Sequence, residues 1–559
     1  MPKVFVYDST LRDGAQMEGV AFSLADKLGI ASQLDNLGVD YIEGGYATSN
    51  PKDMAFFQEV KGCGLKHAKV AAFGNTRRAA KMVEDDPSIM AILAADTPTA
   101  TVVGKSWDLH IRDVIRVSPE DNLRMIEDSV KYLKSKGREV IYDAEHFYDG
   151  YKSNAEVALA TLMAAAEAGA DALVLCDTNG GCLPHEVSEI TAAVAKQTGG
   201  AIGFHGHNDS GCALANTLAS VLAGATHVQG CVNGFGERTG NADLCAIIAD
   251  LQLKMGFDCL PDGRLDMMTE VSRFVYEAAN LPLQDGQPFV GRSAFAHKGG
   301  LHVDAMMKNP RSYEHILPEL VGNERRILVS ELSGGATIAH KLAEFGVPDD
   351  KALRRKILDK VQNLENEGYQ FEIADGSFKL LVRRIIGDAP RFFELEGFRT
   401  IVEKRGHNEA PITEATVKVL VDGVQELCAS EGDGPVNALD GALRKSLEPH
   451  YPRLRDVHLA DYKVRVVNPG AESAAKVRVI AEFAVRSTGE HATDETGKDA
   501  KDAEETKDAL RHFATVGVSE NIVDASWQAI SDAFEYHLIE SARSSAASSP
   551  SALTARTVQ

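Results

Sequence analysis

The chain has 559 residues, of which 44% are hydrophobic and 25% are charged, so a globally disordered chain is excluded. At roughly 150 residues per domain, this length predicts two to four domains or one large barrel with additions, and it excludes a single small binding module. Lys and Arg number 59 and Asp and Glu number 81, and the resulting net charge of −22 disfavours nucleic acid and anionic membrane surfaces as partners.

The N-terminus leads directly into a strand-like run, without the apolar core and cleavage site of a signal peptide. No window approaches the ~20 apolar residues that cross a bilayer. We therefore expect a cytoplasmic protein. The eight cysteines form no CxxC pair and several lie in apolar runs, which predicts buried, reduced thiols.

Residues 3 to about 255 alternate short Val-, Ile- and Ala-rich runs with longer amphipathic stretches. The predicted strands are 3–8, 39–43, 68–73, 88–94, 139–145, 172–177, 201–206 and 227–232. The predicted helices include 23–37, 122–136, 153–168 and 216–223. Eight such units in about 250 residues predict a TIM (β/α)8 barrel, whose parallel strands are buried on both faces. The alternative is an open doubly wound sheet, but the Gly-rich first turn that usually marks it is missing.

After about residue 285 the pattern changes twice. Residues 291–335 are rich in Gly, His and Lys, and 336–390 are mostly helical in pattern. From 395 a mixed α/β region begins, with predicted strands at 395–403, 414–420, 424–428, 461–467, 476–486 and 511–516. The predicted α/β architecture is therefore a catalytic barrel (1–285), helical linker subdomains (286–394), a C-terminal domain (395–540) and a disordered tail (541–559).

The C-terminal region contains a weak internal repeat. The segments VNAL at 436–439 and VDAS at 523–526 each follow a short predicted strand and open a helix, which predicts two strand-strand-helix units with a pseudo-twofold relation. Between them, residues 487–508 are acidic and nearly free of large apolar side chains. Such a segment cannot bury enough surface to fold alone, so we expect a mobile surface loop.

Polar residues gather where the predicted barrel strands end, and in TIM barrels this rim carries the catalytic groups. His205 and His207 lie two residues apart on one strand, so both can face the barrel mouth. Asp13 and Asn241, next to neighbouring strands, would add oxygen ligands. A mixed N/O site of this kind suits Mn²⁺, Zn²⁺ or Mg²⁺. The alternative is two partly solvated histidines bonded to nearby loops.

Two further charged residues at strand ends have both a structural and a functional interpretation. Arg12 beside Asp13 is either a surface ion pair or a group that stabilises an oxyanion near the metal, and its position at a strand end favours the second. Glu145 ends an apolar strand, where it is either a bonded core carboxylate or a proton-transfer group.

Four motifs in order along the chain resemble those of the 2-isopropylmalate, homocitrate and citramalate synthase family. They are DSTLRDGAQ at 8–16, HGHND at 205–209, GERTGN at 236–241 and FAHKGGLHVD at 295–304. The resemblance covers essentially the whole chain. It departs from the usual pattern at Ser9, where Thr is common. The segments at 40–53 and 103–110 are most similar to the citramalate synthase branch of the family.

The resemblance implies an acyltransferase that condenses acetyl-CoA, as co-substrate, with pyruvate and water to give (R)-citramalate and CoA, the first step of a pyruvate route to isoleucine. It implies a divalent metal held by Asp13, His205, His207 and Asn241. It implies catalytic roles for Arg12 and Glu145, and a contact from Thr178 to the oxo acid's carboxylate. The linker residues His302, Asp304 and Tyr313 would reach over the active site of the partner chain in a homodimer. The base that removes the acetyl methyl proton is either His302 or Glu145.

Several alternatives stay open at this point. The acceptor is pyruvate or a larger oxo acid such as 2-oxoisovalerate, the acceptor of 2-isopropylmalate synthases in leucine synthesis, or 2-oxoglutarate, since pockets separate such substrates by only ~1–3 kcal/mol. A metal-dependent acyl-CoA lyase with the same barrel would lack residues 395–540, and a regulator with an inactive barrel would not need the metal-site residues. The C-terminal repeat resembles the family's regulatory domain, which implies isoleucine as effector, or it serves dimerisation alone.

Overall fold

The computed structural model describes residues 1–48, 51–407, 409–468, 475–485 and 511–547. The chain forms two compact units. The first consists of residues 1–296 and 314–326, and the second of 297–313 and 327–559. The predicted linker is thus divided between the two units. No described helix is both long enough and apolar enough to cross a membrane.

The first unit is built on a closed barrel of eight parallel strands, which confirms the predicted TIM barrel. Each strand pairs with the next, and β8 pairs with β1 to close the ring. The strands are β1 (Phe5–Asp8), β2 (Tyr41–Tyr46), β3 (Lys69–Asn75), β4 (Thr99–Lys105), β5 (Glu139–Glu145), β6 (Ala172–Asp177), β7 (Ile202–Gly206) and β8 (His227–Gly230).

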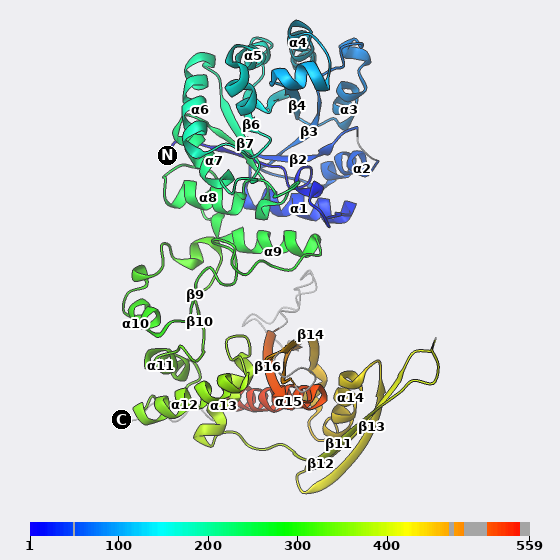
Figure 1. The fold of residues 1–559 in the computed structure, drawn as a ribbon, viewed down its shortest axis with the longest axis vertical. Helices are drawn as coiled ribbons and strands as arrows, with labels where there is room; N and C mark the ends of the chain where they lie inside the picture. The colour runs from blue at the N-terminus through cyan, green and yellow to red at the C-terminus, as the bar shows by residue number, and fades with distance from the viewer. Residues whose placement is uncertain (49–50, 408, 469–474, 486–510, 548–559) are drawn as a thin grey trace, which may run out of the picture. The chain divides into compact units, whose positions relative to one another are not determined.

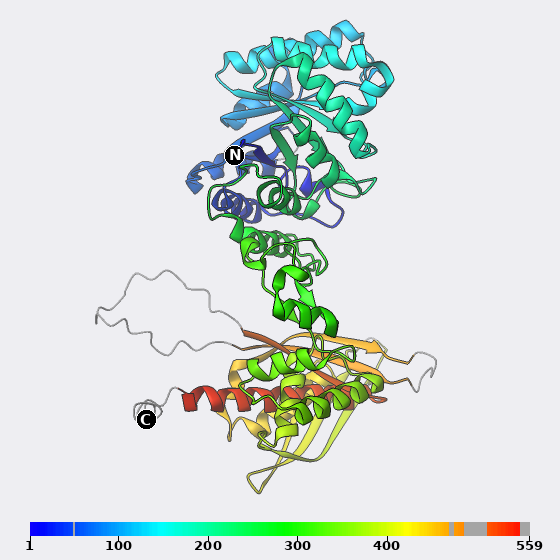
Figure 2. The same cartoon turned by 90° about the vertical axis from the view of Figure 1, so that its left-hand side faces the viewer.

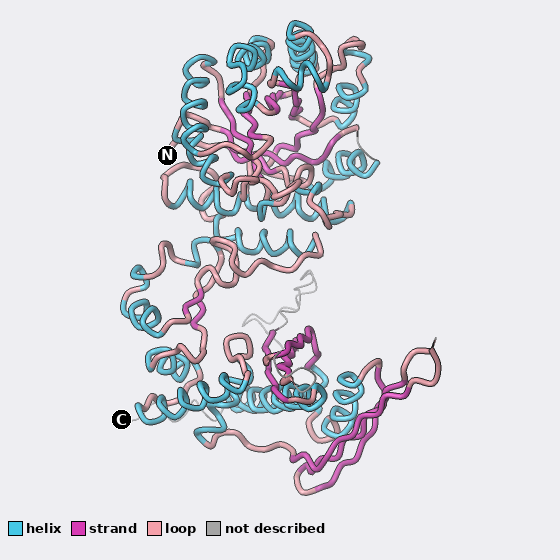
Figure 3. Tube along the Cα trace, in the orientation of Figure 1, coloured by secondary structure: helices cyan, strands magenta, loops and turns pink. Residues whose placement is uncertain are grey.

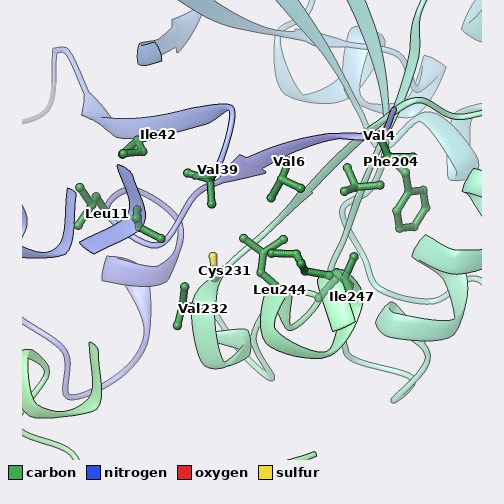
Figure 4. Close-up of a cluster of buried hydrophobic side chains, with 14 of the residues drawn as sticks. Val4, Val6, Leu11, Val39, Ile42, Phe204, Cys231, Val232, Leu244 and Ile247 are labelled. Carbon is green, nitrogen blue, oxygen red and sulfur yellow. The ribbon is translucent and has the colours of Figure 1, made fainter. Parts of the chain in front are cut away.

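Helices surround this barrel on the outside (Figures 1 and 2). They are α1 (Leu24–Leu37), α2 (Pro51–Glu59), α3 (Pro87–Ala95), α4 (Pro119–Ser135), α5 (Phe147–Glu167), α6 (Pro184–Thr198), α7 (Ala213–Leu222), α8 (Leu244–Leu253) and α9 (Met268–Ala278). Figure 4 shows how the core forms between strand and helix, with Val6 of β1 near Leu244 and Ile247 of α8. All three side chains are almost fully buried. Burial of each stabilises the fold by about 1.5–3 kcal/mol.

One predicted strand is wrong. Residues 88–94 are not the fourth strand but lie in α3, and the fourth strand is β4, the next element along the chain. The Asp86 carboxylate accepts hydrogen bonds from the backbone N–H groups of Ser88 and Ile89 and so caps the helix, and Pro87 occupies its first turn. An apolar run of this length does not by itself distinguish a buried helix from a buried strand.

The second unit begins with helices, as the linker pattern predicts. These are α10 (Gly300–Lys308), α11 (Gly335–Glu344), α12 (Lys351–Glu367) and α13 (Asp375–Ile386). The short strands β9 (Ala296–His297) and β10 (Arg326–Ile327) contain two of the three points where the chain passes from one unit to the other, and the third lies between Tyr313 and Glu314.

The C-terminal part of this unit contains two three-stranded antiparallel sheets (Figure 3). The first is β11 (Glu394–Glu403), β12 (Ile412–Val421) and β13 (Val424–Gly432), followed by α14 (Pro435–Leu447). The second is β14 (Val457–Val466), β15 (Val477–Val485) and β16 (Arg511–Ser519), followed by α15 (Ile522–Ala547). The repeat is therefore present, with three strands before each helix. Both copies contribute to one hydrophobic core.

Two segments were predicted to be irregular, and the structure describes only part of one of them. The predicted surface loop at 487–508 lies outside the described residues. Residues 541–547 of the predicted disordered tail instead continue α15, and residues 548–559 lie outside the described residues. All eight cysteines are unpaired, and five of them are buried, in agreement with reduced thiols.

A buried ion pair fixes the end of β2 at the barrel rim. Lys27 of α1 contacts the Asp53 carboxylate of α2 at 2.5 Å and donates to the Gly44 carbonyl oxygen at 3.1 Å. Asp53 also accepts from the Tyr46 backbone N–H at 3.2 Å. Both charged side chains are at least nine-tenths buried. The pair therefore connects two helices to the strand segment that directly follows Glu43.

We predict that Lys27→Met lowers the free energy of unfolding of the barrel by about 3–5 kcal/mol, because it removes the lysine counter-ion of a buried carboxylate. Adding Asp53→Leu should recover part of the loss, since an apolar pair can replace a buried ion pair at little cost. Chemical denaturation of the full chain measures both. The matched control is Lys131→Met, which removes a half-exposed surface pair with Glu127 and should have no measurable effect. Equal effects of the two lysine substitutions would contradict this account.

Candidate active site

Three predicted metal ligands converge at the carboxyl-terminal rim of the barrel. His205 lies on β7 and His207 directly after it, and their Nε2 atoms are 3.4 Å apart. Asp13 follows β1, and its Oδ2 atom lies 3.7 Å from Nε2 of His205 and 3.8 Å from Nε2 of His207. All three side chains are buried. Their ligand atoms are close enough to hold one metal ion together.

The protonation states of these groups suit a cation. Burial lowers the pKa of His205 to about 3 and also lowers the pKa of His207, so both rings are neutral at pH 7. Burial acts to raise the pKa of Asp13, but the neighbouring Arg12 guanidinium and the two imidazoles outweigh it and hold that pKa well below its usual range. Two imidazoles and one carboxylate are typical ligands of Zn²⁺ and Mn²⁺.

Asn241 occupies the place expected of a fourth ligand. Its Nδ2 atom donates to Asp13 Oδ1 at 2.9 Å and to the Phe235 carbonyl oxygen at 3.2 Å. Its Oδ1 atom is buried, and no group in the described part of the chain donates to it. Gly236, with φ of 153°, packs against this amide so closely that a Cβ atom would lie 2.1 Å from Nδ2. An orphaned, buried amide oxygen beside the triad fits a metal ligand.

Arg12 is held rigidly beside this site. Its Nε donates to Glu43 Oε2 at 2.7 Å and its Nη1 to Asp13 Oδ2 at 2.9 Å. The guanidinium carbon lies 4.1 Å from the centre of the Phe73 ring, in a cation–π contact. Burial opposes the charge, but the two carboxylates outweigh it and raise the pKa of Arg12 above its usual value. The interpretation of Arg12 as a simple surface pair therefore does not hold.

Glu43, on β2, belongs to this site although the sequence analysis assigned it no role. It is fully buried and accepts hydrogen bonds from the side chains of Tyr7, Ser9 and Arg12. Its carboxylate therefore sets the orientation of Arg12. The sequence signal that could have identified it is an acidic residue inside an otherwise apolar strand, because a buried carboxylate needs several donors.

Glu145 and Thr178 lie at the ends of β5 and β6. Glu145 forms an ion pair with Lys105 of β4, and it lies close to His110 and His146 in a second cluster of ligand atoms. The Thr178 hydroxyl accepts from the His146 backbone N–H at 2.9 Å. Glu145 and Thr178 thus both lie next to His146. The group of ligand atoms that contains Glu145 is separate from the one that contains Asp13.

The predicted linker residues belong to the second unit. His302 stacks on Tyr313, with ring centres 4.1 Å apart and planes inclined by 25°. Asp304 pairs with Lys308 at 2.6 Å. His302 and Tyr313 are exposed. The proposed role of these three residues over a partner chain's active site stays a prediction.

Comparison with protein families divides the chain into three matched segments. The HMGL-like family matches residues 3–275. The homocitrate synthase post-HMGL domain-like family matches 289–369, and the LeuA allosteric (dimerisation) domain matches 372–538. The three segments follow the predicted order of barrel, linker and C-terminal domain.

Curated relatives match nearly the full length of the chain. The (R)-citramalate synthase of Aquifex aeolicus is 50% identical over 96% of this chain and 98% of its own length. The (R)-citramalate synthase of Geobacter sulfurreducens is 49% identical over 97% of this chain and 98% of its own. That of Synechocystis is 48% identical over 96% of each chain. The chain therefore belongs to the (R)-citramalate synthases, within the 2-isopropylmalate and homocitrate synthase family.

Proposed function

We propose that this chain condenses acetyl-CoA with pyruvate and water to give (R)-citramalate and CoA. The observation that carries this proposal is the full-length match to (R)-citramalate synthases. The buried set of Asp13, His205 and His207 beside a rigid arginine supports it, because this arrangement suits a reaction in which negative charge develops on a carbonyl oxygen.

In this proposal, Asp13, His205, His207 and Asn241 hold a divalent cation, Mn²⁺, Zn²⁺ or Mg²⁺. When bound there, such an ion supplies Lewis-acid polarisation of the oxo acid's carbonyl group. The neutral imidazoles and the ionised carboxylate offer free lone pairs at pH 7. The site is buried, so little water competes with the substrate oxygens for these ligands.

Arg12 binds and orients the oxo acid. Its guanidinium donates to Glu43 and to Asp13, and no acceptor among the described residues engages its remaining N–H groups, which can therefore donate to the substrate's oxygens. When the acetyl methyl carbon forms its bond to C2 of pyruvate, the carbonyl oxygen becomes an alkoxide. A preorganised guanidinium next to that oxygen stabilises the transition state without having to reorganise. Thr178 is proposed to contact the substrate carboxylate.

A base must first remove the weakly acidic methyl proton of acetyl-CoA. Glu145 and His302 are the two candidates, and water then hydrolyses the thioester to release CoA. Glu145 is only partly buried and pairs with Lys105. His302, with Asp304 and Tyr313, would act from the partner chain of a homodimer, where its exposed ring would be available.

The C-terminal domain is proposed to bind isoleucine as a feedback effector, which would place the reaction at the start of a pyruvate route to isoleucine. The twofold repeat and the match to an allosteric domain family support regulation and a homodimer. A purely structural dimerisation domain is the alternative. It would leave turnover insensitive to amino acids.

We predict that CoA release from acetyl-CoA has its highest kcat/KM with pyruvate, in a panel with 2-oxobutyrate, 2-oxoisovalerate and 2-oxoglutarate. Isoleucine should inhibit the reaction and leucine should not. Preference for 2-oxoisovalerate, with inhibition by leucine, would instead assign the chain the 2-isopropylmalate synthase reaction. CoA release with none of the four acceptors would contradict a synthase and favour the lyase or the inactive regulator.

We predict that His207→Ala lowers turnover by about 100-fold or more and reduces bound metal, because it removes one of the proposed ligands. Circular dichroism should show an intact fold. The control is His185→Ala, at an exposed position of α6, which should retain wild-type activity and metal content. Wild-type metal content and activity in the His207 variant would reject the site.

A further inference from the structure

We propose that Gln229 and Asp143 form a hydrogen-bonded relay that positions His205 as a metal ligand. The proposal rests on the proposed metal site. It adds residues deeper in the barrel that would not themselves contact the metal. Both residues point into the barrel interior from strands, Gln229 from β8 and Asp143 from β5. Neither residue stood out in the sequence as a candidate for the site.

Two consecutive hydrogen bonds connect His205 to Gln229 and Gln229 to Asp143. Nδ1 of His205 lies 3.1 Å from Oε1 of Gln229. Nε2 of Gln229 donates to Oδ1 of Asp143 at 3.0 Å. All three side chains are at most 5% exposed, so no bulk water competes for these bonds. Each link joins a donor to an acceptor, and each is within ordinary hydrogen-bond distance.

This arrangement determines which nitrogen of His205 carries the proton. The amide oxygen of Gln229 only accepts, so the Nδ1 atom that faces it must be the protonated one. The opposite nitrogen, Nε2, then keeps its lone pair. That atom faces Asp13 and His207, where the metal would lie. Reversing the amide would place an N–H group against Nδ1 and leave the ring proton on Nε2, where it would block metal binding.

Asp143 is what prevents that reversal. Its oxygen accepts from the Gln229 N–H2 group and so favours one orientation of the amide over the other. Outer partners of this kind commonly orient metal-bound histidines, and their loss typically weakens metal affinity about 10- to 100-fold. The relay therefore has a function beyond satisfying buried polar atoms.

The two histidines of the site differ in the hydrogen bonding of their Nδ1 atoms. Nδ1 of His207 is buried, and none of the described residues provides it with a hydrogen-bond partner. Of the two proposed histidine ligands, His205 is therefore the one whose Nδ1 atom is fixed by a hydrogen bond. The relay also follows from the barrel's register, because His205 and Gln229 are directly paired positions of β7 and β8. The pairing of these two neighbouring strands places the amide beside the ring.

The test is the affinity of the full-length, metal-free protein for Mn²⁺, measured by isothermal titration calorimetry. We expect Gln229→Met to raise the Kd for Mn²⁺ by about 10- to 100-fold, because methionine fills the space but cannot accept from Nδ1. Gln229→Glu should restore the Kd to within about threefold of the wild type, because it keeps an oxygen acceptor.

The matched control is Asn216→Leu. Asn216 is an equally buried amide of the same barrel, and its Nδ2 donates to the Cys182 carbonyl oxygen at 2.8 Å rather than to a group at the metal site. Its loss should lower stability without changing the Kd for Mn²⁺. A purely structural role for Gln229 would make the two variants behave alike.

An increase of less than tenfold in the Kd of Gln229→Met, with the fold intact, overturns the relay. An equally weak Kd in Gln229→Glu also overturns it. If Gln229→Met does not fold, Gln229→Asn is tested by the same criterion, since its amide is one methylene too short to bridge both partners. A wild-type chain that binds no Mn²⁺ overturns the metal site and the relay together, whereas wild-type binding with an unchanged Gln229→Met overturns the relay alone.

Discussion

Closure of eight parallel strands into one barrel is the constraint on which the proposed chemistry depends. It brings the carboxyl ends of β1, β2 and β7 to a single rim, so that residues far apart in the sequence meet within a few ångströms. Burying several charges there is costly unless each is paired. Arg12 meets this requirement by lying between the Asp13 and Glu43 carboxylates. The packed strands beneath keep these groups in place before substrate arrives.

Two clusters at the rim contain histidine and a carboxylate, and burial distinguishes them. In the cluster of His110, Glu145 and His146, the carboxylate pairs with Lys105, the Nδ1 atom of His146 lies 3.3 Å from Asp149, and His146 alone of the three is buried. In the cluster with Asp13, by contrast, the two imidazole Nε2 atoms face each other and one carboxylate oxygen. Full burial of its three side chains and the orphaned Asn241 Oδ1 atom beside Asp13 therefore favour the second of these clusters for the metal.

The sequence predicted most of the fold and the polar rim, for identifiable reasons. His205 and His207 could be placed on one strand face by their spacing alone, and Arg12 and Asp13 by their position after the first strand. The error at 88–94 arose because a short apolar run fits a helix or a strand, and the Asp86–Pro87 capping signal decided it. Glu43 and Gln229 could not be assigned roles, because their partners lie on or next to neighbouring strands and, for Gln229, also on β5 across the barrel. Such contacts depend on closure and register, which local patterns do not encode.

The central claim is that one divalent cation binds between Asp13, His205 and His207. Crystals of the full-length protein grown with Mn²⁺ and measured near the manganese absorption edge would locate the ion directly. The account predicts one strong anomalous peak per chain, about 2.0–2.3 Å from the Nε2 atoms of both histidines and from an Asp13 oxygen. A peak at His110, Glu145 and His146 instead, or no peak at the Asp13 cluster, would contradict it.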